Sequence, residues 1–257
     1  EEAFLPRATV DEVYAQIISD AEYAIANLAP PARFPQSGEA TKGSATILLA
    51  DVYVTRKAYA EAERLLETLP AMGYDLFDNY ADAFATENKN GKESLFEIQY
   101  QQGLQGGQQS NFIYKFIPRS KNTKIVTGVA TNNSSLGGWN MPTQDLIADY
   151  EEGDLRKTAS IAIAEGTYDA SYVFTYTANT EIDDYVPAEG VEGVPYIKKY
   201  LHPHTNTNNT DDNWPIYRYA EALLFWAEAI NEQSGRSAEA LPYLNKVRRR
   251  AGLEPVT

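Results

Sequence analysis

The sequence predicts a mainly α protein in which tetratricopeptide-like helical hairpins flank a loop-rich, partly β middle region. Near both ends of the chain, apolar residues recur at spacings of three and four, the pattern of amphipathic helices. Between about residues 74 and 213 this pattern fades, and glycine, asparagine, glutamine and serine become frequent. We therefore expect a helical region over residues 1–73, a loop-rich region with short strands over 74–213, and a helical hairpin over 214–257.

Three helices are predicted in the first region. Thr9 and Glu12 have the spacing of a capping box, which opens the first helix, and Pro30-Pro31 ends it. The second and third helices are expected near residues 41–55 and 59–72. The stripe expected to face inward on the first helix consists of Val10, Val13, Ile17, Ala21, Ala24, Ile25 and Leu28.

A short-range pattern relates the second helix to the third. Ala50, Tyr53 and Ala62 follow one another at spacings of three and nine residues, the small–aromatic–small pattern of a tetratricopeptide hairpin. Small residues allow two helices to approach closely, and the tyrosine fills the space beside them.

The remaining regular elements are fewer. Apolar and polar residues alternate over residues 93–100, which predicts a half-buried strand, and a helix is expected near 143–151. In the last region one apolar stripe begins at Tyr219 and includes Trp226, which we expect in the core. Ser237 is expected to cap the final helix, whose last turn carries three arginines that complement the helix dipole.

Composition and charge exclude some functions and favour others. The formal net charge is −14, with 36 acidic and 22 basic residues, which weighs against nucleic-acid binding because phosphates require clustered cations. The absence of cysteine excludes thiolate catalysis, disulfides and thiolate zinc sites. Eighteen tyrosines and three tryptophans, with abundant asparagine and glutamine, favour recognition of neutral, hydroxyl-rich ligands.

No catalytic motif is found, and we predict no catalytic residue, no metal and no cofactor. The carboxylate pairs at 151–152 and 183–184 have the residue types of a glycosidase, but a solvated acidic face explains them better. His202 and His204 lack a third ligand. A solvated loop is also favoured over a calcium site for the polar run of Asn206, Asn208, Asn209, Asp211 and Asp212.

The strongest candidate binding residue is Trp139. It follows two glycines in the sequence NNSSLGGWN at 132–140, with amides on both sides. An aromatic ring can stack on the apolar face of a sugar while amides bond its hydroxyls. Buried packing remains the alternative for Trp139, and it is favoured for Trp214 and for Tyr168, Tyr172 and Tyr176. The predicted ligand-binding residues are Trp139, Asn140, Asn132, Asn133, Tyr100, Gln102 and Asn111.

Three stretches resemble the SusD/RagB family of outer-membrane nutrient-binding lipoproteins. The first is RYAEALLFWAEAIN at 218–231, followed by YLNKVRRRAGL at 243–253. The second comprises TKGSA at 41–45, LLADVY at 48–53, YADAF at 80–84 and KESLFEIQY at 92–100. The third is GDLRK at 153–157.

The resemblance implies tetratricopeptide-like hairpins behind a ligand-binding face formed by residues 74–213. It also implies a non-catalytic protein that binds oligosaccharide or polysaccharide at the extracellular face of the outer membrane. Such a protein is anchored by lipid and delivers its ligand to a SusC-like TonB-dependent transporter. Family members are longer, so we expect this sequence to be a fragment lacking both ends. The alternative is a helical-repeat scaffold that binds protein and no sugar.

Overall fold

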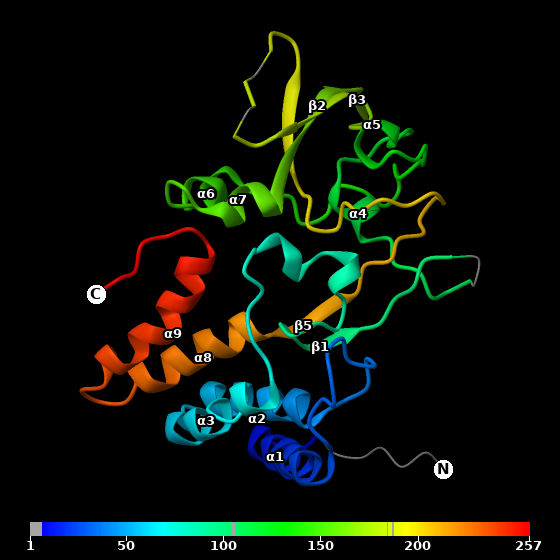
Figure 1. The fold of residues 1–257 in the computed structure, drawn as a ribbon. Helices are drawn as coiled ribbons and strands as arrows, with labels where there is room; N and C mark the ends of the chain where they lie inside the picture. The colour runs from blue at the N-terminus through cyan, green and yellow to red at the C-terminus, as the bar shows by residue number, and fades with distance from the viewer. Residues whose placement is uncertain (1–6, 104–105, 184, 187) are drawn as a thin grey trace.

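The structure is a computed structural model that describes residues 7–103, 106–183, 185–186 and 188–257. Figure 1 shows two parts: one gathers the long helices, and the other gathers a three-stranded sheet and several short helices. The long helices are α1 (Val10–Asn27), α2 (Lys42–Thr55), α3 (Tyr59–Leu66), α8 (Tyr219–Asn231) and α9 (Ser237–Arg250). The mainly helical prediction therefore holds for both ends of the chain.

Helix α1 begins at the predicted capping box. Thr9 N donates to Glu12 Oε2 over 2.8 Å, and Glu12 N donates to Thr9 Oγ1 over 3.3 Å. The expected inward stripe is only partly correct, because Ala21 is the one buried residue of the helix. Val10 and Val13 are 64% and 48% exposed. Helix α1 packs on α2 and leaves much of its apolar face uncovered.

The first core cluster joins α2, α3, α8 and α9. Trp226 is buried as expected, and its ring stacks on Tyr243 with centroids 4.1 Å apart. Ala50 and Ala62 are fully buried on α2 and α3, where their small side chains permit close helix packing. The tetratricopeptide comparison itself stays a prediction. Helix α3 is shorter than predicted and is followed by a 3₁₀ turn, η1 (Pro70–Met72), that ends at Gly73 with a φ of 89°.

Helix α9 differs from the prediction at its start. Ser237 is its first residue and the cap residue is Arg236, which makes no side-chain capping bond. Arg236 instead pairs with Glu63 of α3 over 2.6 Å. At the other end Arg250 is buried against Glu93, which is 1% exposed and also binds Arg218. The last-turn arginines thus include a buried structural contact.

The predicted strand at 93–100 is β1 (Ser94–Ile98), which pairs antiparallel with β5 (Trp214–Arg218). The helix predicted at 143–151 is the shorter α6 (Gln144–Ala148). A sheet that was not predicted has the antiparallel order β3-β2-β4. Its strands and the further elements are β2 (Ile161–Tyr168), β3 (Phe174–Glu181), β4 (Glu192–Ile197), α4 (Phe112–Phe116), α5 (Lys124–Thr127), α7 (Leu155–Ser160), η2 (Ala81–Ala83) and η3 (Thr86–Asn88).

A second core cluster lies between this sheet and α4. Fully buried Tyr114 and Tyr196 belong to it, together with Phe174 and Tyr176 of β3. Trp214 packs at its edge as expected, stacked on Tyr200 with an interplanar angle of 12°. The loop-rich region therefore has a core of its own, which gives its surface loops a rigid base.

Candidate functional site: an exposed aromatic surface

Trp139 lies at the end of a loop that is bonded along its length to the segment 115–123. Its side chain is 59% exposed, so the alternative of buried packing is wrong. Trp139 N donates to Lys115 O over 2.9 Å, and Gly138 N donates to Ile117 O over 2.8 Å. The ring is therefore presented to solvent by a backbone that is fixed on both sides of Gly138.

Asn133 holds this loop from inside. Its Nδ2 donates to Tyr114 O over 2.9 Å and to Pro118 O over 3.2 Å, and its Oδ1 accepts from Ser120 N over 2.8 Å. The side chain is fully buried. Because every polar atom of the amide already has a protein partner, Asn133 has no contact to offer a ligand. We correct its predicted role to that of a loop support.

The other two asparagines of the loop lie at the surface. Asn132 is exposed, and its Oδ1 accepts hydrogen bonds from Ser134 N over 3.0 Å and from Ser134 Oγ over 2.7 Å. Asn140 is exposed at a φ of 51°, next to Trp139. Both side chains are exposed, and their binding role stays a prediction.

Tyr172, which was expected in the core, is 73% exposed. It lies in the turn between β2 and β3 at a φ of 55°. Asp169 fixes this turn, because its Oδ1 accepts from Ser171 N over 2.8 Å and from Val173 N over 3.0 Å. The same N–H groups of Val173 and Ser171 hold the pKa of Asp169 below its usual value. Tyr176 is buried as expected, and Tyr168 is half-buried.

Arg119 connects the two aromatic loops. Its Nη2 donates to Ser171 O over 3.2 Å and to Tyr172 O over 3.3 Å. Its Cγ lies 3.6 Å from the place that a Cβ on Gly138 would occupy. Trp139 and Tyr172 therefore flank one arginine, and we call Arg119, Trp139 and Tyr172 the aromatic surface. The alternation of buried and exposed residues in β3, directly after this turn, is the sequence signal for a hairpin at Tyr172.

A groove of about 540 Å³ begins at the turn that carries Tyr172. One wall is the start of β3, and the other is the segment that includes α5. Its lining includes both polar and apolar side chains. Its lining residues are Ser120, Lys121, Asn122, Lys124, Ile125, Asp169, Val173, Phe174, Thr175 and Tyr176.

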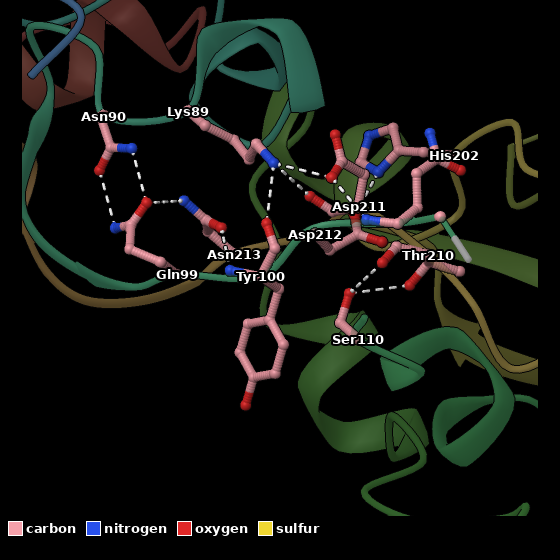
Figure 2. Close-up of polar contacts among 12 residues, drawn as sticks. Lys89, Asn90, Gln99, Tyr100, Ser110, His202, Thr210, Asp211, Asp212 and Asn213 are labelled. Carbon is pink, nitrogen blue, oxygen red and sulfur yellow. Dashed lines mark hydrogen bonds and ion pairs between the residues drawn. The ribbon is translucent and has the colours of Figure 1, made fainter. Parts of the chain in front are cut away.

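Of the predicted residues beyond β1, Tyr100 belongs to a polar crosslink (Figure 2). Tyr100 N donates to Asn213 Oδ1 over 2.8 Å, and Tyr100 O accepts from Lys89 Nζ over 3.0 Å. The Tyr100 ring packs edge-on against Phe112 and is half-buried. Gln102 is exposed, with its backbone N bonded to Asp211 Oδ1 over 3.0 Å. These contacts anchor the loop after β1.

Asn111 precedes α4 and is half-buried, without a side-chain capping bond. Among the residues that the structure describes, no hydrogen bond or ion pair joins Asn111, Tyr100 or Gln102 to the Trp139 loop. The seven predicted binding residues thus fall into two groups, and the Trp139 group is the one that presents an open ring. The binding role of Tyr100, Gln102 and Asn111 stays a prediction.

The run at 206–213 is not a simple solvated loop. Asp212 and Thr210 are 2% and 1% exposed, and Figure 2 shows the run turned toward the strand end and Lys89. Lys89 Nζ lies 2.9 Å from Asp211 Oδ1, and Ser110 Oγ lies 2.9 Å from Thr210 Oγ1. The run therefore crosslinks the loop after β1 to the strand β5.

The two histidines also make structural hydrogen bonds in this region. His202 Nδ1 bonds to Asp212 Oδ1, and His204 Nε2 lies 2.6 Å from the Tyr114 hydroxyl. In the described ranges, histidine, aspartate and glutamate side chains nowhere gather in a group of three that would hold a metal ion. Both imidazoles are explained by these structural contacts.

One carboxylate of each candidate pair forms a surface ion pair. Glu151 pairs with Arg248 over 2.6 Å, and this contact holds the pKa of Glu151 below its usual value. Asp183 pairs with Lys157 over 2.7 Å, and Asp184 lies outside the described residues. Within the part of the chain that the structure describes, none of the helices has the length and apolar character needed to span a bilayer.

Comparison with known proteins decides the family. The SusD family model matches residues 92–257. The chain belongs to the SusD family. It is 32% identical to SusD-like protein P2 of Formosa agariphila over 95% of this chain and 47% of that protein. The chain thus spans about half the length of such SusD relatives, and the family resemblance found in the sequence is confirmed.

Solved structures show that the fold is SusD-like. A SusD superfamily protein from Parabacteroides distasonis matches with a TM-score of 0.74 at 24% identity, over 100% of this chain and 54% of that one. Surface glycan-binding protein A from Bacteroides thetaiotaomicron, in complex with laminarihexaose, matches with a TM-score of 0.72 at 22% identity. That match covers 97% of this chain and 56% of the other.

Proposed function

We propose that this chain binds oligosaccharide or polysaccharide on the aromatic surface, without chemical change to the ligand. The observation that carries the proposal is the exposed ring of Trp139 on a loop fixed by Asn133. Exposing a large aromatic ring to water is unfavourable in free energy, and a ligand that covers the ring removes this penalty. Sugar rings present C–H faces of the matching kind, and Asn132 and Asn140 supply amides for their hydroxyls.

We propose that the exposed ring of Tyr172 contacts a second sugar unit. Like Trp139, it is held by a local hydrogen-bond motif and not by burial of its ring. Aromatic contacts contribute about 0.5–1.5 kcal/mol each beyond area burial. Modest affinity from two rings suits a protein that must capture a ligand and then release it.

Within the longer protein, we propose that residues 74–213 provide the ligand-binding face and that residues 1–73 and 214–257 provide the helical scaffold. Such a protein would stand, lipid-anchored, on the extracellular side of the outer membrane and pass its glycan to a SusC-like TonB-dependent transporter. The family membership supports this placement, as does the laminarihexaose complex of surface glycan-binding protein A.

The test is isothermal titration of the chain with a panel of soluble polysaccharides. Trp139→Ala should weaken binding of a positive glycan about tenfold, because stacking and ring burial are lost together. Tyr23→Ala is the matched control, since Tyr23 is 72% exposed on α1, far along the chain from the predicted site. Equal binding by both variants and the unchanged chain would contradict the proposed site.

A second candidate function is a helical scaffold that binds protein and no sugar. The uncovered face of α1, where Val10 and Val13 are exposed, favours it. This reading predicts that no glycan of the panel binds, while Val10→Asp with Val13→Asp abolishes capture of a co-produced SusC-like barrel. Retained capture by that variant, with glycan binding that depends on Trp139, would decide for the first function.

A further inference from the structure

The charge of the chain is strongly segregated along the sequence. Residues 98–144 contain four cationic side chains and no aspartate or glutamate, although the whole chain has a formal charge of −14. The cationic residues are Lys115, Arg119, Lys121 and Lys124. This segment also contains Trp139, so the basic stretch and the aromatic surface coincide.

The fold places these charges on the surface beside the candidate site. Arg119 is exposed between the loops of Trp139 and Tyr172. Lys121 and Lys124 are exposed and line the groove that begins at the Tyr172 turn. The cations therefore continue from the aromatic surface into the groove.

These charges are not neutralised by acidic partners. Within the described residues, none of the four has a carboxylate oxygen within 4.0 Å, whereas Arg236 pairs with Glu63 and Arg250 with Glu93. Arg119 is held by the carbonyl oxygens of Ser171 and Tyr172, which fix its position and leave its charge intact. The guanidinium of Arg119 is thus held in one position and remains charged, as is needed to bind an anion.

Asp169 is the acidic residue of the groove lining. Its Oδ1 accepts two backbone N–H groups of the turn, so its first role is to fix the turn of Tyr172. The groove lining thus carries two lysines, Lys121 and Lys124, against this one carboxylate, so its net charge stays positive.

We infer that the groove and the adjoining aromatic surface bind an anionic segment of a saccharide, through a sulfate ester or a uronate carboxylate held by Lys121 and Lys124 of the groove and by Arg119 beside it. This inference rests on the proposed function, because the same chain would stack its sugar rings on Trp139 and Tyr172. Sulfate and carboxylate oxygens accept charge-assisted hydrogen bonds from ammonium and guanidinium groups. The neutral ligand expected from overall composition is thereby replaced by an anionic one.

The first experiment compares ligands that share a backbone. Binding of a sulfated polysaccharide is measured beside its desulfated form, and binding of a polyuronate beside its carboxyl-reduced form. We expect one anionic member to bind more tightly than its neutral partner, and to weaken as salt is raised because salt screens exposed charges. The pair that shows the difference identifies the anionic group as sulfate or carboxylate.

The second experiment uses charge variants of the groove. Lys121→Gln with Lys124→Gln should weaken binding of the preferred anionic glycan about fivefold, as expected for two exposed charge contacts. The matched control, Arg33→Gln with Lys57→Gln, removes the same charge from exposed scaffold positions and should change binding less than twofold. Asp169→Asn keeps the Oδ1 acceptor of the turn and should strengthen binding about twofold.

The outcomes separate this inference from the proposed function. Equal binding of charged and neutral partners, with the groove variant behaving like its control, would overturn the inference. Glycan binding that still depends on Trp139 would then leave the proposed function standing. If no saccharide of either kind binds, both are wrong.

Discussion

The side-chain amide nitrogen of Asn133 lies 2.5 Å from the position that a Cβ on Gly137 would occupy. The same Cβ would come within 2.8 Å of Ile117 O and 3.0 Å of Arg119 Cα. Glycine is therefore required by close packing at this point, two residues before Trp139. A side chain at position 137 would push against Asn133, which supports the loop, and would thereby shift the Trp139 ring that the loop presents.

Gly137→Ala should displace the Trp139 loop without unfolding the second core. We expect a loss of stability of about 1–3 kcal/mol from overpacking and weaker glycan binding. Thermal melts, tryptophan fluorescence and titration would measure these effects. Gly106→Ala is the control, since no atom lies within 4 Å of its Cβ position. An unchanged affinity in Gly137→Ala would show that the loop position does not matter for binding.

Asn133→Ala should destabilise the chain by about 2–4 kcal/mol, because it leaves the carbonyls of Tyr114 and Pro118 and the N–H of Ser120 without their partner. Urea denaturation would measure the loss. The exposed neighbour provides the comparison: Asn132→Ala should cost less than about 1 kcal/mol. Similar losses for the two variants would argue against the supporting role of Asn133.

Glu93→Gln keeps the size of the side chain and removes its charge. It should lower the free energy of unfolding by about 3–5 kcal/mol. Glu93 is 1% exposed and is the acidic partner of both Arg218 and Arg250, so two cations lose their counter-charge. Glu239→Gln removes a carboxylate whose side chain is 58% exposed and should change the stability far less, because solvent screens an exposed ion pair. Chemical denaturation of both variants tests the contrast.

Stability should fall in alkaline solution. Burial raises the pKa of Tyr219 to about 12, and it raises the pKa of Tyr176 above its usual value as well. An unfolded tyrosine ionises near pH 10. The stabilisation is therefore complete below about pH 10 and is lost as pH rises toward the folded-state value. Urea midpoints at several pH values from 8 to about 11.5 would test this; a constant midpoint would contradict it.

The sequence was sufficient for elements whose signal is local. The capping box at Thr9 marks a real helix boundary, and the alternation at 93–100 marks a real strand. Strand β2 was missed because Ile161 through Ala164 are buried on both faces, which removes the alternation by which a half-buried strand is recognised. Strand β3 does alternate buried and exposed residues, yet no strand was predicted there.

The candidate site was predictable where its signal is also local in the sequence. Glycines and amides around Trp139 indicated an open loop, and its ring is exposed. The sequence had no means to distinguish Asn132 from Asn133, because only the tertiary contacts with the segment 114–120 turn one inward. Tyr172 was placed in the core because its spacing of four from Tyr168 and Tyr176 imitates a packed face, whereas a turn separates the two strands.

The attachment of the Trp139 loop and the Tyr172 turn to one short segment has an evolutionary consequence. Arg119 and its neighbours bond to both loops, while neither core cluster needs the exposed rings. Substitutions at the tips of the two loops can therefore retune ligand preference at little thermodynamic penalty. Adaptation to a new polysaccharide therefore requires substitutions at a few surface positions only, and the fold is retained.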